Sequence, residues 1–135
     1  MKGCKIIDIK KIVESDGTLL VMEEKSPIPF EIKRIFMVTN VAKGKTRGDH
    51  ATKKTKLILF PVAGSCTVVV DNGSEKESFF MNDISKGLYI DELLWRSMQN
   101  FTDDCVMMAV CDRTYTPGNE TYETYDEYLN AIGKK

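Results

Sequence analysis

The stretch KLILFPVAGSCTVVVDNGSEKESFFM, residues 56–81, decides the fold. Its apolar runs at 56–61, 65–70 and 78–81 have the length and composition of strands, and turn-forming residues separate them. The Asn-Gly pair within residues 71–74 is typical of a hairpin, because these residues readily adopt positive φ angles. Residues 62–64, Val-Ala-Gly, predict a second, tight hairpin. The stretch therefore favours antiparallel β-structure.

The rest of the chain extends this pattern and adds one helix. Residues 30–38 are apolar on both faces, which predicts a central strand. Residues 121–132 place three tyrosines, Leu129 and Ile132 at spacings of three and four, so we expect a helix whose tyrosines pack against the body of the protein. Further strand-like runs are residues 17–22, 87–90 and 105–111. The sequence thus predicts an all-β protein, a single domain over 1–135, built as a small antiparallel barrel or sandwich with a C-terminal helix.

Composition excludes several broad classes of partner. The 135 residues are 42% hydrophobic, enough for a real core, and 19 basic against 20 acidic residues leave a net charge of −1. A near-neutral chain does not favour a nucleic-acid or membrane-surface binder. No apolar run approaches the ~20 residues of a membrane span, and residues 1–4 do not begin a signal peptide.

The four cysteines indicate a reducing compartment. Cys4, Cys66, Cys105 and Cys111 lack the CxxC spacing of zinc sites and lie in or beside apolar stretches. We therefore expect buried free thiols and a cytoplasmic protein, because disulfides form mainly in oxidising compartments.

A basic segment holds the only histidine of the chain. His50 lies within Arg47-Gly48-Asp49-His50-Ala51-Thr52-Lys53-Lys54. Histidine is the side chain that titrates near neutrality, so a histidine among cations suggests proton transfer beside an anionic ligand. Charge runs are often only solvated surface, and an exposed loop with an incidental histidine is the alternative.

Five blocks of sequence together carry a resemblance to a known family. They occur in order and at suitable spacing: residues 30–34, 47–56, 64–66, 87–90 with Trp95, and 104–108. In these blocks the chain resembles the cupin-fold sugar 3,4-ketoisomerases, from about Ile6 to the terminal helix. The resemblance implies a jelly-roll cupin that binds a dTDP-linked 4-keto-6-deoxy sugar. It also implies isomerisation of that sugar through an enediol, without a cofactor, in the biosynthesis of dideoxy amino sugars.

Two positions depart from the family pattern. In the basic block the family has Arg-Gly-x-His-Ala-His-Lys-Lys, whose first histidine is matched by His50 while Thr52 occupies the place of the second. Family members also carry a tyrosine in the strand after residues 33–34, where this chain has Phe36 and Met37. The departures leave a second hypothesis open, a non-catalytic cupin that binds the nucleotide sugar or serves as a partner subunit.

Strand alternation indicates which side chains would form the binding site. If His50 faces the barrel interior, then Thr52, Lys54 and Lys56 share its face. Imidazole, hydroxyl and ammonium groups on one face suit an anionic nucleotide sugar. A neighbouring strand would add Arg34. The guanidinium of Arg47, which comes just before this face, could hold the diphosphate. The predicted substrate-binding residues are therefore Arg34, Arg47, Thr52, Lys54 and Lys56.

The implied chemistry needs a base and a cation, and no metal. The places of a general cupin's metal ligands correspond here to His50, Thr52, about Lys56 and about Arg96. One imidazole, one hydroxyl and two cations cannot coordinate a divalent ion, so we expect no metal site. Removal of the C3 proton suits an imidazole, and the oxyanion that develops needs a fixed cation or hydrogen-bond donor. His50 and Arg96 are the predicted catalytic pair, with Lys54 as an alternative to Arg96.

A homodimer is the expected assembly. The resemblance implies it, and every residue of 105–111 is apolar, so both faces of that strand need cover. The alternative is a strand in the middle of the sandwich, covered on both faces by its own chain.

Overall fold

Fourteen strands and one helix make up residues 1–134, the part of the chain that the structure, a computed structural model, describes. The elements are β1 (Cys4–Asp8), β2 (Lys10–Glu14), β3 (Gly17–Val21), β4 (Glu23–Glu24), β5 (Pro27–Ile28), β6 (Arg34–Thr39), β7 (Arg47–Thr52), β8 (Leu57–Ala63), β9 (Cys66–Asp71), β10 (Lys76–Met81), β11 (Lys86–Ile90), β12 (Trp95–Gln99), β13 (Val106–Cys111), β14 (Thr121–Tyr122) and α1 (Tyr125–Ala131).

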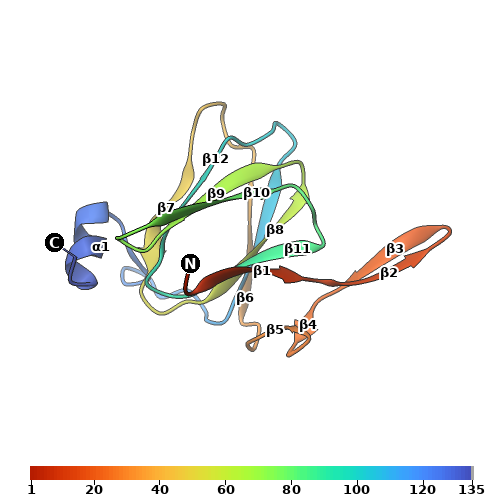
Figure 1. The fold of residues 1–135 in the computed structure, drawn as a ribbon, viewed down its shortest axis with the longest axis horizontal. Coiled ribbons are helices and arrows are strands. Elements are labelled where there is room, and N and C mark those ends of the chain that lie inside the picture. Colours follow the sequence, from red (N-terminus) through yellow and green to blue (C-terminus); the bar gives the residue numbers. More distant parts are fainter. Residues whose placement is uncertain (135) are drawn as a thin grey trace.

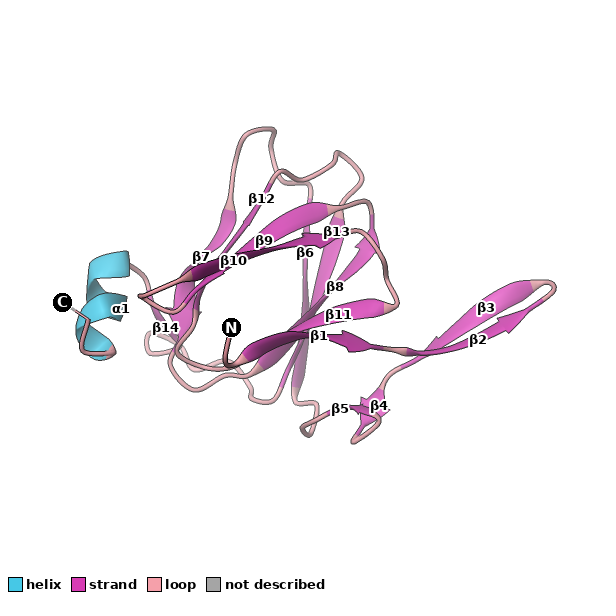
Figure 2. Cartoon of the chain, viewed as in Figure 1, coloured by secondary structure: helices cyan, strands magenta, loops and turns pink. Residues whose placement is uncertain are grey.

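Two five-stranded antiparallel sheets face each other and form a sandwich (Figure 1). The first sheet has the strand order β1-β11-β8-β13-β6, and the second has the order β10-β9-β12-β7-β14. The β2–β3 hairpin projects from one end of the sandwich, and helix α1 lies at the other end (Figure 2). The expected small antiparallel sandwich with a C-terminal helix is confirmed.

Apolar side chains fill the space between the sheets. On β9 and β13, Val68, Val70 and Met107 point inward and are at most 1% exposed. A second cluster, which includes Phe60 and Val110, lies on the outer face of the first sheet and packs under residues 20–32. Both faces of β13 are therefore covered within one chain. The apolar composition of β13 therefore does not support a dimer, because the strand lies in the sandwich and its own chain covers both faces.

One of the two predicted hairpins is confirmed and the other is wrong. Strands β9 and β10 pair from Asp71↔Lys76 onward around the turn that contains Gly73 at φ +90°. Strands β8 and β9, by contrast, belong to different sheets, so residues 62–64 do not form a hairpin. Val62 and Ala63 end β8, and the chain crosses to the other sheet at Gly64 and Ser65. Gly64 allows this crossing: its φ is +62°, and a Cβ there would lie 2.8 Å from Cα of Cys105.

The run 30–38 forms an edge strand, so the prediction of a central strand is wrong. Strand β6 starts at Arg34 and pairs only with β13. Its residues alternate, with Arg34 and Phe36 facing inward while Ile35 and Met37 are 55% and 57% exposed. The outward residues are apolar without cover from their own chain, which explains why the sequence resembled a strand buried on both faces.

The helix is shorter than expected and begins at Tyr125. The side chain of Thr124 caps it by accepting a hydrogen bond from the backbone N–H of Glu127, while residues 121–122 form strand β14. Tyr125 and Tyr128 pack against Trp95, with ring centroids 5.4 and 5.8 Å away. The packing role of these two tyrosines is therefore confirmed, but Tyr122 lies outside the helix.

Cysteine chemistry agrees with the sequence analysis. All four cysteines are free and buried. Burial raises the pKa of the Cys66 thiol to about 12, which makes it unreactive. Among residues 1–134, no helix is long and apolar enough to cross a membrane.

Candidate active site

A pocket of about 430 Å³ opens at one side of the sandwich. Strand β6 of the first sheet and strands β7, β12 and β14 of the second provide its walls. Four residues predicted from the sequence line it together: Arg34, His50, Thr52 and Arg96.

Strand pairing sets the central pair of the pocket. Arg96 on β12 lies directly opposite His50 on β7 in the antiparallel ladder, and its Nη2 is 3.3 Å from Nε2 of His50. A guanidinium nitrogen can only donate, so Nε2 accepts this hydrogen bond and Nδ1 carries the proton of the neutral imidazole. The Nε2 lone pair and the cation thus lie side by side at the pocket wall.

Burial and charge keep His50 neutral. Burial, followed by the repulsion of Arg96, lowers the pKa of His50 to about 4, although the nearby carboxylates of Glu123, Asp49 and Glu120 oppose the shift. Burial also lowers the pKa of Arg96 to about 10, which still leaves it charged at neutral pH. The pocket therefore combines an unprotonated base with a fixed positive charge.

Arg34 is held from the opposite sheet by Glu120. Its Nη2 donates to Oε1 of Glu120 at 2.8 Å, and the hydroxyl of Thr55 donates to the same oxygen at 2.7 Å. Burial raises the pKa of Glu120, but the hydrogen bonds from Thr55 and Arg34 outweigh it and lower the pKa. Nε of Arg34 and Nη1 of Arg96 are buried without a hydrogen-bond partner among the described residues.

Thr52 lies in the pocket, but its proton is already engaged. The side chain is almost fully buried, and its hydroxyl donates to the carbonyl oxygen of Thr55 at 2.7 Å. Thr52 can therefore only accept a hydrogen bond from a ligand or a water molecule. A histidine at this position would also reach the pocket.

Three predicted binding residues, Arg47, Lys54 and Lys56, do not line the pocket. The continuous polar face that alternation predicted is therefore wrong beyond Thr52. Strand β7 ends at Thr52, and the alternation ends with it. Lys54 lines a smaller hollow with Lys53 and Arg113, while Nζ of Lys56 lies 3.9 Å from Glu92.

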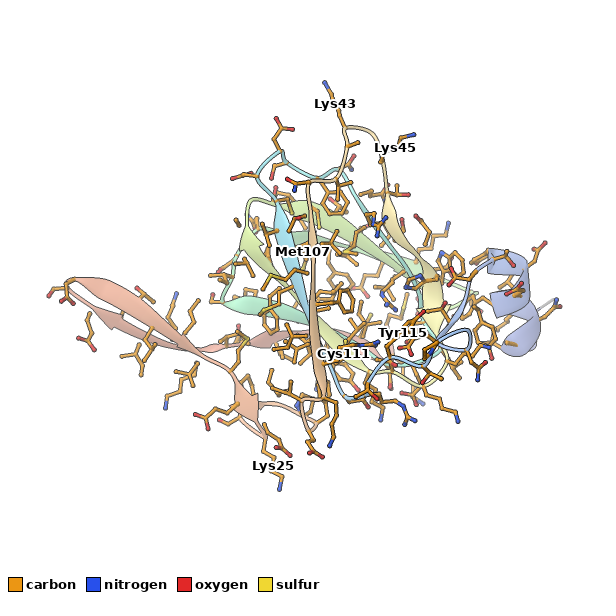
Figure 3. All side chains as sticks on the ribbon, turned by 180° about the vertical axis from the view of Figure 1, so that it is seen from behind. Lys25, Lys43, Lys45, Met107, Cys111 and Tyr115 are labelled. Atoms are coloured by element: carbon orange, nitrogen blue, oxygen red, sulfur yellow. The ribbon has the colours of Figure 1, made fainter. Side chains whose placement is uncertain are left out.

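Arg47 lines a third cavity, between β6 and β7. Residues 37–42 and Lys45 form the rest of its wall, and Figure 3 shows Lys45 near the tip of the β6–β7 loop. Arg47 therefore belongs to this cavity and not to the pocket around His50.

The segment that precedes the helix contributes pocket residues that the sequence analysis missed. Tyr115, Glu120 and Glu123 all line the pocket, and Figure 3 shows Tyr115 on the stretch between β13 and α1. The Tyr115 ring centroid lies 5.7 Å from the guanidinium carbon of Arg34. A tyrosine is thus present at the pocket, although it does not come from β6. Among the described residues there is no group of three or more His, Cys, Asp or Glu side chains that could hold a metal ion.

Residues 2–133 match the family model FdtA, described as WxcM-like, C-terminal. The chain belongs to this family. The TDP-4-oxo-6-deoxy-alpha-D-glucose-3,4-oxoisomerase of Aneurinibacillus thermoaerophilus is 35% identical over 130 residues, which are 95% of this chain and 94% of that protein. The identification of the chain with the sugar 3,4-ketoisomerases is confirmed.

Solved structures agree over the whole fold. A histidine-to-asparagine variant of the 3,4-ketoisomerase QdtA from Thermoanaerobacterium thermosaccharolyticum, in complex with TDP-4-keto-6-deoxyglucose, is 33% identical. It has a TM-score of 0.94 and the match covers 100% of this chain and 97% of that one. WlaRA, a TDP-fucose-3,4-ketoisomerase from Campylobacter jejuni, is also 33% identical, with a TM-score of 0.89 and coverage of 97% and 96%.

Proposed function

We propose that this chain is a sugar 3,4-ketoisomerase that acts on a TDP-linked 4-keto-6-deoxyhexose, with His50 as acid and base and Arg96 as the partner of the developing oxyanion. The observation that carries the proposal is the contact of 3.3 Å between Nε2 of His50 and Nη2 of Arg96 in the pocket of a chain from this family. The lowered pKa of His50 supports the role of base, because an unprotonated imidazole can accept a proton at neutral pH.

The reaction moves one carbonyl between adjacent sugar carbons. As the sugar binds, Arg96 transfers its hydrogen bond from Nε2 to O4, which frees the Nε2 lone pair. Nε2 takes the proton from C3, the C3–H electron pair forms the C3–C4 double bond, and the charge moves to O4. Arg96 stabilises this oxyanion, and the hydroxyl proton of O3 passes to O4. The imidazolium exchanges this proton with solvent and then delivers a proton to C4 as the carbonyl forms at C3, so atoms and charge balance without an external oxidant or reductant.

The position of Arg96 suits such an oxyanion. C3 and O4 of the sugar are separated by two bonds, and the base and the cation of the pocket are in hydrogen-bond contact. Electrostatic stabilisation of this kind, by preformed donors in a site that excludes water, is usually the largest single contribution to catalysis.

A single imidazole is enough if both proton transfers occur on the same face of the sugar. This feature accommodates Thr52, whose hydroxyl is too weak an acid or base to replace the family's second histidine. Thr52 would accept a hydrogen bond from the sugar or from a water, since its own proton is donated to Thr55.

The anionic part of the substrate would extend beyond the pocket. Two cationic hollows lie next to it, one with Arg47 and Lys45, and the other with Lys53, Lys54 and Arg113. Arg47 remains our proposed anchor of the diphosphate, because a guanidinium can pair with phosphate oxygens through two parallel hydrogen bonds.

A homodimer is the assembly that we infer, now from two exposed apolar surfaces. Ile35 and Met37 are more than half exposed on the edge strand β6, and Val13 and Leu19 are 69% and 57% exposed on the projecting β2–β3 hairpin. Single exposed apolar residues need no explanation, but groups of them on an edge strand and a hairpin fit an interface. Sedimentation of a 15.3 kDa monomer at micromolar concentration would rule the dimer out. The buried free cysteines fit our further proposal of a cytoplasmic location.

The second hypothesis, a cupin that binds the nucleotide sugar without turnover, rests on Thr52 and on the absence of a tyrosine from β6. Incubation with TDP-4-keto-6-deoxyglucose in D2O separates the two hypotheses. Ketoisomerase activity gives a 3-keto product and carbon-bound deuterium. Tight binding without product or exchange would favour the second hypothesis.

A further inference from the structure

The carboxylate of Glu123 lies on the far side of the His50 ring from Arg96. Strand β14 pairs with β7 through Thr121↔Thr52 and Tyr122↔Ala51. Continued by one residue, this antiparallel register brings Glu123 opposite His50, although Glu123 itself follows the end of the strand. Oε2 of Glu123 is 4.0 Å from Nδ1 of His50.

A second contact orients this carboxylate. The hydroxyl of Thr121 donates a hydrogen bond to Oε1 of Glu123, which leaves Oε2 for the imidazole. The ring of His50 therefore has a guanidinium at Nε2 and a carboxylate on the side of Nδ1, and Nδ1 carries the hydrogen of the neutral tautomer.

We infer that Glu123 is a positioning residue for the reaction, which accepts the Nδ1–H of His50 and stabilises the imidazolium that forms when Nε2 takes a proton. The inference rests on the proposed function. Glu123 itself gains and loses no proton: the Nδ1 hydrogen stays on the ring while Nε2 takes a proton from C3 and delivers one to C4. A contact at Nδ1–H also limits rotation of the ring, so that Nε2 stays at the pocket wall beside Arg96.

The other charged groups around the ring do not provide this contact. Arg96 faces it from β12 and repels the imidazolium, and Arg34 adds a second positive charge in the same pocket. Asp49 on the same strand is exposed and accepts a hydrogen bond from the hydroxyl of Thr46, and Glu120 is engaged by Arg34. Only Glu123, among the described carboxylates, lies within ion-pair distance of the imidazole.

Exposure explains why the contact is loose without substrate. The side chain of Glu123 is 71% exposed, so water screens its attraction for His50. A sugar in the pocket would exclude part of this water and strengthen the interaction, at the step where the imidazolium forms.

The test compares Glu123→Gln and Glu123→Asp with Glu127→Gln, a matched loss of charge on helix α1. Turnover and the pH profile of kcat/KM are measured on the full chain. Glu123→Gln is expected to lower kcat by about 10–100-fold, the range for groups that orient histidine ligands in metal sites. The acidic limb of the kcat/KM profile of Glu123→Gln should lie at lower pH than that of the wild type, because the carboxylate of Glu123 raises the pKa of His50. Glu123→Asp should restore part of both, and Glu127→Gln should behave as the wild type.

A measurement without turnover separates the inference from the proposed function. His50 is the only histidine, so the imidazole ¹⁵N signals of the untagged chain need no assignment. They are expected to show the Nδ1–H tautomer at pH 7 and a lower pKa in Glu123→Gln than in the wild type. If the wild type is active and Glu123→Gln has the same kcat, the same acidic limb and the same ¹⁵N titration, the inference is overturned. A wild type that makes no 3-keto product would overturn the proposed function, while the ¹⁵N titration still tests the contact.

Discussion

Replacement of Arg96 by Met should separate catalysis from stability. Methionine keeps the unbranched chain and removes the guanidinium, so the enediolate oxygen loses its cationic partner. Loss of one such partner typically costs about 2.7–4 kcal/mol of transition-state stabilisation, so kcat should fall by about 100–1,000-fold. Binding of the nucleotide should change little, because Arg96 contacts the sugar end of the proposed site.

The same change should not destabilise the fold. Arg96 is 3% exposed, its Nη1 has no partner among the described residues, and its one described side-chain hydrogen bond is to the neutral His50. Burial lowers its pKa from the ordinary value of an arginine to about 10, which corresponds to a penalty on the order of 3 kcal/mol. Replacement of a buried charge that lacks a close counter-ion by an apolar side chain is often neutral or stabilises by about 1–4 kcal/mol.

The assay combines urea unfolding at pH 7 with steady-state kinetics on TDP-4-keto-6-deoxyglucose. Arg96→Lys is the matched control, because it keeps a charge but loses the planar donor group, and its kcat should fall between those of the wild type and Arg96→Met. A variant Arg96→Met that is destabilised by more than about 2 kcal/mol, yet retains its kcat, would show that Arg96 is structural and refute the reasoning.

Three further outcomes are expected. The pKa of His50 is about 4 in the folded chain and 6.5 in the unfolded chain, so the unfolded state binds more protons between these values. The free energy of unfolding should be at its full value above pH 6.5 and fall by at most about 3 kcal/mol toward pH 4. Urea unfolding of His50→Asn should show a smaller fall over the same pH range. Equal falls in the wild type and the variant would contradict this prediction. Thr52→His should raise kcat and leave nucleotide affinity unchanged in calorimetry, whereas a lower kcat would mean that the lost hydrogen bond to Thr55 matters more. Arg47→Ala should weaken nucleotide binding by about 1.5–3 kcal/mol. If the Kd of Arg47→Ala is unchanged and that of Lys54→Ala is raised, the diphosphate lies in the hollow lined by Lys54.

Local sequence patterns predicted the structure correctly where neighbouring residues alone determine it. The Asn-Gly turn formed the β9–β10 hairpin, and the alternation around His50 correctly placed Thr52 in the same pocket. Arg34, expected from a neighbouring strand, lines that pocket as well. The comparison with the metal ligands of a general cupin added Arg96, which strand alternation could not connect to His50. That pair lies 46 residues apart and meets only through the pairing of β7 with β12.

The errors arose where the fold overrides the local pattern. Residues 62–64 look like a hairpin, but residues 62 and 63 end β8, and the chain passes from there to the other sheet. Alternation predicted that Lys54 and Lys56 share the face of His50, but a strand end cannot be located from residue type alone, and β7 stops at Thr52. The acidic residues 120 and 123 occur in an irregular segment without periodicity, and only the register of β14 on β7 brings them to the pocket.

Deuterium exchange by His50→Asn tests the role of His50 most directly. The wild type, incubated in D2O with TDP-4-keto-6-deoxyglucose, should give 3-keto product with deuterium on a ring carbon. His50→Asn should bind the nucleotide sugar with nearly the same Kd and give neither product nor exchange, because an amide cannot accept a proton at neutral pH. If His50→Asn retains the exchange rate of the wild type, His50 is not the base, and another group of the pocket must remove the proton from C3.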